Sequence, residues 1–319
     1  MKNLWNEEEA AACGEDALAL RVYSSRLIGQ ASDLVLHGGG NTSVKAEFSD
    51  IFDDRHEVLY VKGSGWDLAT IEAPGFAPVA LDALLKLSRF DVLSDADMVR
   101  AQRAAMLDPG APNPSVEAIL HALIPFRFVD HTHADAVVTL TNTPDGEARV
   151  REIYGDRLLV VPYVMPGFVL AKKVAEMTKD IDWSTLEGMI LMNHGIFSFA
   201  DDARESYTRM IDLVTEAEQA LGGAAPVTND TAGASALELA AIRYEVSQAA
   251  NRPMLIDFDG GAQSCSFARR EDVKPIATRG PLTPDHVIRT KRIPLVVEDD
   301  PSEAVAAFVS DYQDYFDRH

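Results

Sequence analysis

The sequence predicts a mixed α/β protein because it combines strand-like runs, helical segments and sufficient length. Short apolar runs such as Val58–Val61 and Leu158–Val161 have the length of buried strands. Longer segments such as Asp201–Leu221 repeat apolar residues at helical spacing. A chain of 319 residues exceeds one average domain, so we expect one large unit or two smaller ones.

Composition and charge narrow the class of protein. The chain is 47% hydrophobic and 25% charged, as soluble globular proteins are, and no apolar run reaches the ~18 residues of a membrane span. Its net charge of -21 repels phosphate backbones and anionic lipid, so we expect no nucleic-acid or membrane partner. Two cysteines, Cys13 and Cys265, predict free thiols, and an acidic N-terminus without a signal peptide predicts a cytoplasmic location.

The first third of the chain is expected to place two glycine loops at strand ends. The segment Glu7–Gln30 has a broadly apolar face, which predicts a helix before the first glycine loop. Two more helices are expected after the second glycine loop. In order, the expected elements are a helix over Glu7–Gln30, strands over Leu34–Leu36 and Thr42–Val44 around the loop His37–Asn41, a strand over Val58–Val61 ending in Lys62–Gly65, and helices over Val79–Phe90 and Asp95–Leu107.

The middle of the chain begins at the break Ala111–Pro114. Ser115 is the expected N-cap of the next helix, since its hydroxyl can accept a free N–H of the first turn. That helix would carry Glu117 and His121 on one face. The elements expected next are a strand through His131 and His133, a turn at Thr143–Gly146, a helix over Glu147–Tyr154, a strand over Leu158–Val161, a helix over Val169–Lys179, a hairpin of Gly188–Met192 with Ile196–Phe199, and a helix over Asp201–Leu221.

Residues 222–235 are small and polar without periodicity, which predicts a linker. It separates a domain over residues 1–221 from a C-terminal extension over residues 236–319. The extension is expected to hold a helix over Leu237–Asn251, a strand over Met254–Phe258, an irregular proline-containing stretch and a last helix over Ser302–Phe316.

Three histidines predict a metal site. His131 and His133 lie two residues apart at the end of an apolar run, and such residues share one face of an extended strand. His194 follows a second apolar run, Met189–Met192. Three imidazoles with an open position are typical of a catalytic zinc site. Two unrelated histidines on a strand remain the alternative for His131 and His133.

Glu117 is the candidate general acid/base beside that metal. The role requires a carboxyl pKa moved toward neutrality by burial. An ordinary solvated helix carboxylate is the alternative reading. His121, one helical turn away, and His37, beside the first glycine loop, are candidates to line the same site.

Glycine-rich segments suggest anion binding. Gly38-Gly39-Gly40-Asn41 lacks the dinucleotide spacing and is no P-loop, yet successive glycines let the backbone approach an anion closely. Lys62-Gly63-Ser64-Gly65 adds a cation to the same pattern, and Ser115 would supply free N–H groups at a helix start. A tight loop without a ligand is the alternative.

Five ordered motifs together resemble the class II aldolase/adducin family over about residues 15–221. They are Gly39-Gly40-Asn41-Thr42-Ser43, Gly63-Ser64-Gly65, Ser115-x-Glu117, His131-x-His133 and Asn193-His194-Gly195. The resemblance implies a three-layer α/β/α fold with a mainly antiparallel central sheet, here with a C-terminal extension. Within the family, the chain resembles in particular the aldolase half of bifunctional rhamnulose-1-phosphate aldolase/alcohol dehydrogenases, although its sequence contains no dehydrogenase fingerprint.

The resemblance also implies roles for residues. His131, His133 and His194 match the zinc ligands, and Mn²⁺, Co²⁺ or Fe²⁺ also suit such a site. Glu117 matches the catalytic acid/base. The matches to the phosphate pocket are Gly40, Asn41, Ser64, Gly65 and Ser115. Val116 and Gly38 stand where the family often has hydroxyl residues, and Lys62 is a candidate to compensate. The family's catalytic tyrosine, which a neighbouring subunit supplies, is not assigned among Tyr154, Tyr163, Tyr312 and Tyr315.

The implied activity is cleavage of a ketose 1-phosphate of the L-rhamnulose 1-phosphate type to dihydroxyacetone phosphate and an aldehyde, through a zinc-stabilised enediolate. A sugar-phosphate 4-epimerase and an aldolase for another sugar or sugar acid are the alternatives within enzymes. A non-catalytic adducin-like protein is the alternative outside them, and the three histidines and Glu117 argue against it. The implied partners are a sugar phosphate and other copies of the chain, with a homotetramer favoured.

Overall fold

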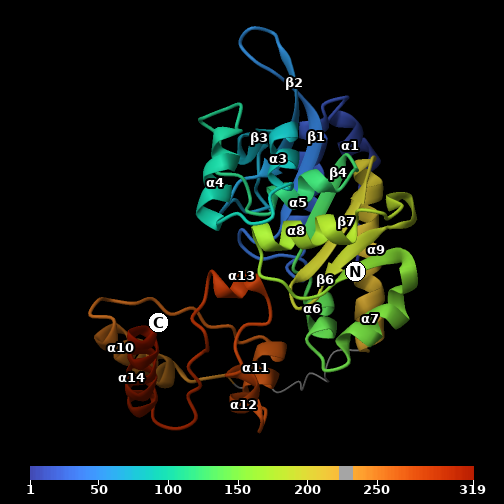
Figure 1. Cartoon of the computed structure of the whole chain (residues 1–319). Coiled ribbons are helices and arrows are strands. Elements are labelled where there is room, and N and C mark those ends of the chain that lie inside the picture. Colours follow the sequence, from blue (N-terminus) through green and yellow to red (C-terminus); the bar gives the residue numbers. More distant parts are fainter. Residues whose placement is uncertain (223–232) are drawn as a thin grey trace. The chain divides into compact units, whose positions relative to one another are not determined.

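A computed structural model describes residues 1–222 and 233–319, and they form two compact units (Figure 1). The first unit comprises Met1–Gly223 together with Leu282–Arg289, and the second comprises Ala224–Pro281 and Thr290–His319. A short piece of the C-terminal region therefore belongs to the first unit. The predicted linker, 222–235, falls largely on residues 223–232, which lie outside the described residues.

A seven-stranded sheet forms the centre of the first unit, in the order β3-β2-β1-β4-β7-β6-β5. All neighbouring strands are antiparallel except β5 and β6, which are parallel, so the predicted mainly antiparallel sheet is confirmed. The strands are β1 (Asn41–Ser49), β2 (Arg55–Lys62), β3 (Phe76–Ala80), β4 (Phe128–Thr132), β5 (Leu158–Val161), β6 (Gly188–Leu191) and β7 (Gly195–Ala200).

Helices pack on both faces of this sheet, which confirms the predicted α/β/α layering (Figure 1). One apolar core joins the sheet to α2 (Ala17–Gly29), α6 (Asp135–Thr141), α7 (Gly146–Tyr154) and α9 (Ala203–Leu221). Cores on the other face join it to α3 (Leu81–Leu87), α4 (Asp95–Ala104), α5 (Ala118–Leu123) and α8 (Phe168–Met177). Short 3-10 turns lie at Ala73–Gly75, Gly155–Arg157 and Trp183–Thr185.

Two predictions near the N-terminus are wrong. The single helix expected over Glu7–Gln30 is two helices, α1 (Glu7–Ala12) and α2, because Gly14 takes a positive φ of 61° and Asp16 caps the start of α2. The run Leu34–Leu36 forms no strand. It is an apolar turn that packs Leu34 into the core, and the first strand begins at Asn41, after the glycines.

Two further boundaries differ from the prediction. Strand β3 takes the start of the expected helix Val79–Phe90; it is an edge strand, where Pro78 is tolerated. Helix α5 begins at Ala118 with Glu117 as its N-cap residue, so Ser115 is not the N-cap. The Ser115 hydroxyl instead accepts the Glu117 N–H at 3.2 Å, which fixes the turn before the helix.

The second unit is helical in its described part. It contains α10 (Ala236–Ala249), α11 (Ala262–Ala268), α12 (Val273–Ala277) and α14 (Pro301–Arg318), and α10 packs against α14. The strand expected at Met254–Phe258 does not form. Within the described residues no helix is long and apolar enough to cross a membrane. Both cysteines are free thiols, as predicted.

Candidate metal centre

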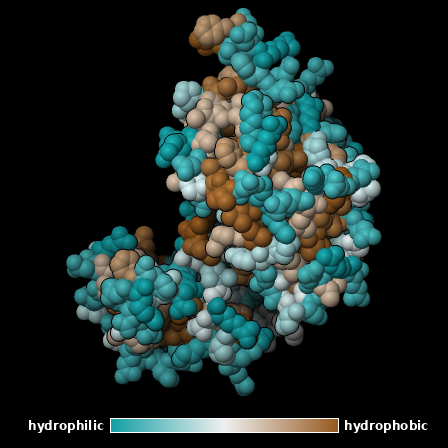
Figure 2. Space-filling model, in the orientation of Figure 1, coloured by the Kyte–Doolittle hydropathy of each residue, from teal (hydrophilic) through white to brown (hydrophobic). Residues whose placement is uncertain are grey.

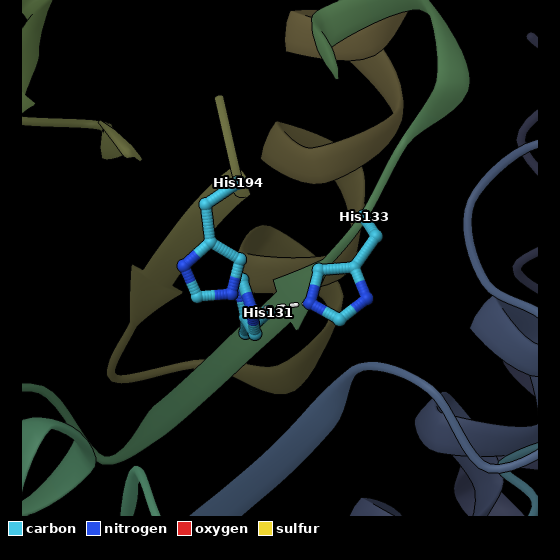
Figure 3. Close-up of side chains that lie close together, drawn as sticks. All are labelled: His131, His133 and His194. Carbon is cyan, nitrogen blue, oxygen red and sulfur yellow. Dashed lines mark hydrogen bonds between the residues drawn. The ribbon is translucent and has the colours of Figure 1, made fainter. Parts of the chain in front are cut away.

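Three buried histidines from two chain segments converge on one point (Figure 3). His131 lies on β4, His133 follows that strand, and His194 lies in the turn between β6 and β7. One ring nitrogen from each lies within 4.8 Å of the others. His131 and His133 lie two residues apart, and their rings reach the same point, as the geometry of an extended strand predicts.

The β6–β7 turn brings His194 to the other two. Asn193 adopts a left-handed conformation, with φ 59°, that asparagine tolerates better than most residues. A Cβ on Gly195 would overlap the carbonyl oxygen of Thr132 and lie 3.0 Å from the His131 ring. The missing side chain at Gly195 therefore lets the turn close onto the end of β4.

The hydrogen bonds of the rings leave their inner nitrogens free to bind a cation. His131 directs Nδ1 to the Ile196 carbonyl oxygen at 3.0 Å, and His133 directs Nδ1 to the Asp285 carboxylate at 2.5 Å. Both acceptors require a protonated Nδ1, so the two Nε2 atoms present lone pairs to each other across 3.2 Å. That arrangement suits a bound cation, which would relieve the repulsion between the two lone pairs.

Burial keeps the His131 and His194 imidazoles neutral. Desolvation lowers the pKa of His131 well below its ordinary value, and the neighbouring His133 and His194 lower it further. Desolvation is also the main cause that lowers the pKa of His194, against the opposing effect of Glu117. Neutral imidazole is the form that binds metal, so the site is prepared for an ion without loss of protons from these two rings.

Glu117 lies beside the histidines. Its Oε2 is 3.4 Å from His131 Nε2, and its Oε1 is 3.8 Å from His194 Nε2. The carboxylate is buried, and Oε1 has no hydrogen-bond partner; Nδ1 of His194 also lacks one. A buried carboxylate oxygen without a donor is costly, and a cation at the centre would satisfy it. The donor set therefore fits a divalent ion of the zinc type.

Asn41 and His121 form a buried network around Glu117. Asn41 Nδ2 donates to Glu117 Oε2 at 2.7 Å, and Asn41 Oδ1 contacts His121 Nε2. His121 Nδ1 pairs with the Ser43 hydroxyl at 2.8 Å. The sequence-based interpretation places Asn41 in a phosphate pocket; in the structure its side chain holds the Glu117 carboxylate. His121 lines the site through Asn41.

The predicted anion contacts lie close to this network. Ser64 and Gly65 form an exposed turn after β2, and the Ser64 N–H donates to the Asn113 carbonyl oxygen at 2.8 Å. The Ser115 N–H donates to the Lys62 carbonyl oxygen at 3.1 Å, so this residue lies beside the same turn. A Cβ on Gly38 would lie 3.3 Å from the Gly65 carbonyl oxygen, which places the two glycine loops in contact.

Lys62 and Gly40 connect the loops. The Lys62 ammonium donates to the carbonyl oxygens of Gly38 at 2.7 Å and Gly40 at 3.0 Å, so this cation already holds the loop backbone. Burial lowers the pKa of Lys62 to about 8, while the nearby Asp285 opposes that shift. Gly40 has φ 56° and packs against Val35 and the His131 backbone, which leaves no space for a side chain.

Two candidate residues lie away from the histidine centre. His37 is exposed, and its Nδ1 lies 3.9 Å from Asp67. Tyr154 is buried and donates to the Leu213 carbonyl oxygen at 2.7 Å, away from the histidines. Neither side chain therefore contributes to the centre within this chain.

Two aspartates near the histidines have different roles. Asp130, on the same strand as His131, points to the opposite face and pairs with Arg21 at 2.5 Å. Asp285 contacts His133 directly, and sequence reasoning missed it because it lies 152 positions after that histidine.

Comparisons with known proteins give a consistent result. The model of the class II aldolase and adducin N-terminal domain matches residues 20–221, and that of the second domain of class II aldolase matches residues 233–319. The Bacillus subtilis (strain 168) protein called uncharacterized oxidoreductase YuxG is 33% identical over 348 residues, covering 100% of this chain and 49% of that protein. This chain thus spans about half the length of that relative.

Solved structures are also similar to part of this chain. The N-terminal class II aldolase domain of a conserved Thermoplasma acidophilum protein is 40% identical, with a TM-score of 0.63 over 69% of this chain and 99% of that one. L-fuculose-1-phosphate aldolase from Thermus thermophilus is 18% identical, with a TM-score of 0.39 over 63% of this chain and 93% of that one.

Proposed function

Because the chain belongs to the class II aldolase and adducin family, we propose that it is a metal-dependent aldolase acting on a sugar phosphate. The proposed reaction cleaves a ketose 1-phosphate of the L-rhamnulose 1-phosphate type to dihydroxyacetone phosphate and an aldehyde. The observation that carries the proposal is the convergence of His131, His133 and His194 beside the buried carboxylate of Glu117.

The three histidines are the proposed metal ligands. Zn²⁺ suits three imidazoles with an open position, and Mn²⁺, Co²⁺ and Fe²⁺ are alternatives. When bound, the ion supplies Lewis-acid stabilisation of the negative charge that carbon–carbon bond cleavage leaves on substrate oxygens. Because the rings are buried and oriented before any ligand arrives, little reorganisation is needed at the centre.

Glu117 is the proposed general acid/base. Its burial and the donor from Asn41 hold the carboxylate beside the histidines. There it can take up the proton that the C4 hydroxyl loses as the C3–C4 bond breaks and then, as the carboxylic acid, give a proton to C3 of the dihydroxyacetone phosphate fragment; the reverse reaction runs these transfers backwards. Asn41 would act here by orienting Glu117. No Schiff base is required, so the reaction places no demand on a lysine.

The substrate phosphate is proposed to bind over the second glycine loop. Ser64 and Gly65 are exposed, and Ser115 lies beside them. Gly40 and Asn41 are buried and would shape the pocket from beneath. A phosphate held at this loop would fix which substrate carbons reach Glu117.

The substitution Glu117→Gln tests the proposal. The amide keeps the shape of the side chain and its contact with Asn41 but cannot exchange a proton, so we expect unchanged zinc content and a turnover lower by about 100-fold or more. The measurement is a coupled assay for dihydroxyacetone phosphate released from L-rhamnulose 1-phosphate, with and without EDTA and zinc add-back. Glu152→Gln, an exposed carboxylate on α7, is the matched control.

Other outcomes identify the alternatives. Full activity of Glu117→Gln would remove this residue from the chemistry. Interconversion of substrate stereoisomers without aldehyde release would favour a sugar-phosphate 4-epimerase. Zinc-loaded protein that releases nothing from this substrate would favour another sugar or sugar acid. A chain that binds no stoichiometric metal would favour a non-catalytic, adducin-like role.

We further propose that the chain assembles into a homo-oligomer, with a tetramer favoured by the family resemblance. Exposed apolar side chains support association: Ile51 and Phe52 are 91% and 76% exposed at the tip of the β1–β2 hairpin, where Figure 2 shows apolar residues, and Tyr163 and Met165 are exposed before α8. Multi-angle light scattering would measure the assembly, and a monomer at micromolar concentration would reject it.

A further inference from the structure

A carboxylate from the C-terminal region contacts the candidate metal centre. Asp285 lies on the short helix α13 (Pro284–Val287), within the Leu282–Arg289 segment that belongs to the first unit. Its Oδ1 is 2.5 Å from His133 Nδ1, and its Oδ2 accepts the Leu36 N–H at 2.7 Å. The residue is buried, being only 2% exposed. Both oxygens are thus engaged, one by the ring and one by the backbone before the glycine loop.

The first glycine loop is shaped around this carboxylate. A Cβ on Gly39 would overlap the Asp285 carboxylate group. Gly39 has no positive φ, so the backbone does not require glycine at this position. The requirement instead comes from the close approach of the carboxylate. The sequence suggests that these glycines approach an anion, and the anion that Gly39 meets in the structure is part of the same chain.

A second contact fixes the segment. Arg289 donates to the His37 carbonyl oxygen through Nε at 2.9 Å and a terminal nitrogen at 2.5 Å. His37 and Leu36 are adjacent, so Arg289 and Asp285 hold neighbouring backbone groups of one loop. The segment is therefore attached at two points, and the carboxylate is positioned by contacts that do not involve the histidines.

We propose that Asp285 is a positioning residue for the metal centre: it holds the His133 ring with Nδ1 protonated and Nε2 directed at His131 and His194. This inference rests on the proposed metal site and adds a residue from the second family domain to it. A carboxylate that accepts from the outer nitrogen of a ligating histidine fixes its tautomer and raises its basicity. Asp285 lies beyond His133 as seen from the centre, so its role is to orient the ligand.

Metal affinity tests the inference without reference to turnover. We would titrate the full chain with Co²⁺ and with Zn²⁺ against a chromophoric chelator. Asp285→Ala should weaken binding by about 10- to 100-fold, the usual effect of losing such a partner. Asp285→Asn should weaken it less, because the amide oxygen still accepts from Nδ1. Gly39→Ala should also weaken it, since it displaces the carboxylate while leaving every ligand in place.

The control is Asp135→Asn. Asp135 is a partly buried carboxylate near Asp285, and the acceptor of the His133 Nδ1–H is Asp285. This variant therefore removes a similar charge and should bind metal as the wild type does. A second readout is the ring Nδ1–H of His133 in protein labelled with ¹⁵N-histidine. Its signal should be protected from exchange with water in the wild type and in Asp135→Asn, and lost in Asp285→Ala.

The outcomes separate two failures. If Asp285→Ala and Gly39→Ala both bound metal as tightly as the wild type, the role of Asp285 would be overturned, while the metal centre would stay intact. Equal weakening by Asp135→Asn would also overturn it, because net charge would then explain the effect. Wild-type protein that binds neither ion would overturn the metal centre itself, and this inference with it. Circular dichroism of the metal-free variants excludes misfolding as the cause.

Discussion

At the scale of single residues, the network around Glu117 contains a buried histidine that stays uncharged. His121 is fully buried between Asn41 and the Ser43 hydroxyl, and desolvation lowers its pKa to about 3. Since an exposed histidine titrates near 6.5, this ring stays neutral in the folded chain through conditions in which the unfolded chain takes up a proton. The network therefore contributes stability that depends on pH.

His121 should make the protein less stable in mild acid. Below pH 6.5 the unfolded state binds the proton that the folded state refuses, so the free energy of unfolding falls as pH drops toward 3, by up to about 1.4 kcal/mol per pH unit for one such group. His121→Gln should reduce the slope between pH 6.5 and pH 4.5 in urea unfolding of metal-free protein. His319→Gln, at the exposed terminus, should not. An unchanged slope in His121→Gln would contradict the assignment.

The sequence predicts some residue roles better than others. The spacing of His131 and His133 indicates convergence because the period of a strand fixes which way side chains point. No comparable rule assigns the partner of Asn41, whose side chain binds Glu117 from 76 positions away. Asp285 is more distant still, and its local context, a short helix after a proline, carries no signal for contact with His133. Long-range contacts of this kind follow from tertiary packing alone.

At the scale of elements, the sequence predicts regular segments where one local pattern dominates. The β6–β7 hairpin and α9 appear as expected because the turn residues and the helical period each point to one structure. The run Leu34–Leu36 misleads, since a buried turn and a short strand have the same apolar composition. Strand β3 is not recognisable in the sequence, because it contains Pro78 and α3 begins directly after it.

Gly195 should be required for the β6–β7 turn to reach the centre. A methyl group there would overlap the Thr132 carbonyl oxygen and crowd the His131 ring, so the turn carrying His194 would have to move. We expect Gly195→Ala to lower the free energy of unfolding by about 1–3 kcal/mol, the usual cost of overpacking, and to weaken zinc binding. Urea unfolding and zinc titration measure the two effects.

Gly110→Ala is the matched control for this element. Gly110 lies in a loop where a Cβ would meet only the Asp108 side chain, at 3.2 Å, so the substitution should leave zinc binding unchanged. If Gly195→Ala bound zinc as tightly as the wild type, the close approach of the turn to β4 would not be needed for the site.

At the scale of the whole molecule, the candidate centre combines parts of the chain that two family models match separately. The histidines and Glu117 lie within residues 20–221, and Asp285 lies within residues 233–319. The first compact unit nevertheless includes Leu282–Arg289. Sequence similarity alone would assign the whole chemistry to the first domain, whereas the structure gives the second domain a contact with a candidate ligand.

Removing the second domain should therefore weaken the metal centre without unfolding the first. A chain of residues 1–222 keeps the sheet, the helices on both faces, the three histidines and Glu117. The similar Thermoplasma acidophilum structure is that of an N-terminal class II aldolase domain, and the match covers 99% of it. We expect cooperative thermal unfolding, with zinc raising the midpoint less than in the full chain, because ligand stabilisation follows affinity.

Introducing Asp285→Ala into the full chain should reproduce most of that loss. If residues 1–222 bound zinc as tightly as the full chain, the contact between Asp285 and His133 would contribute nothing to affinity.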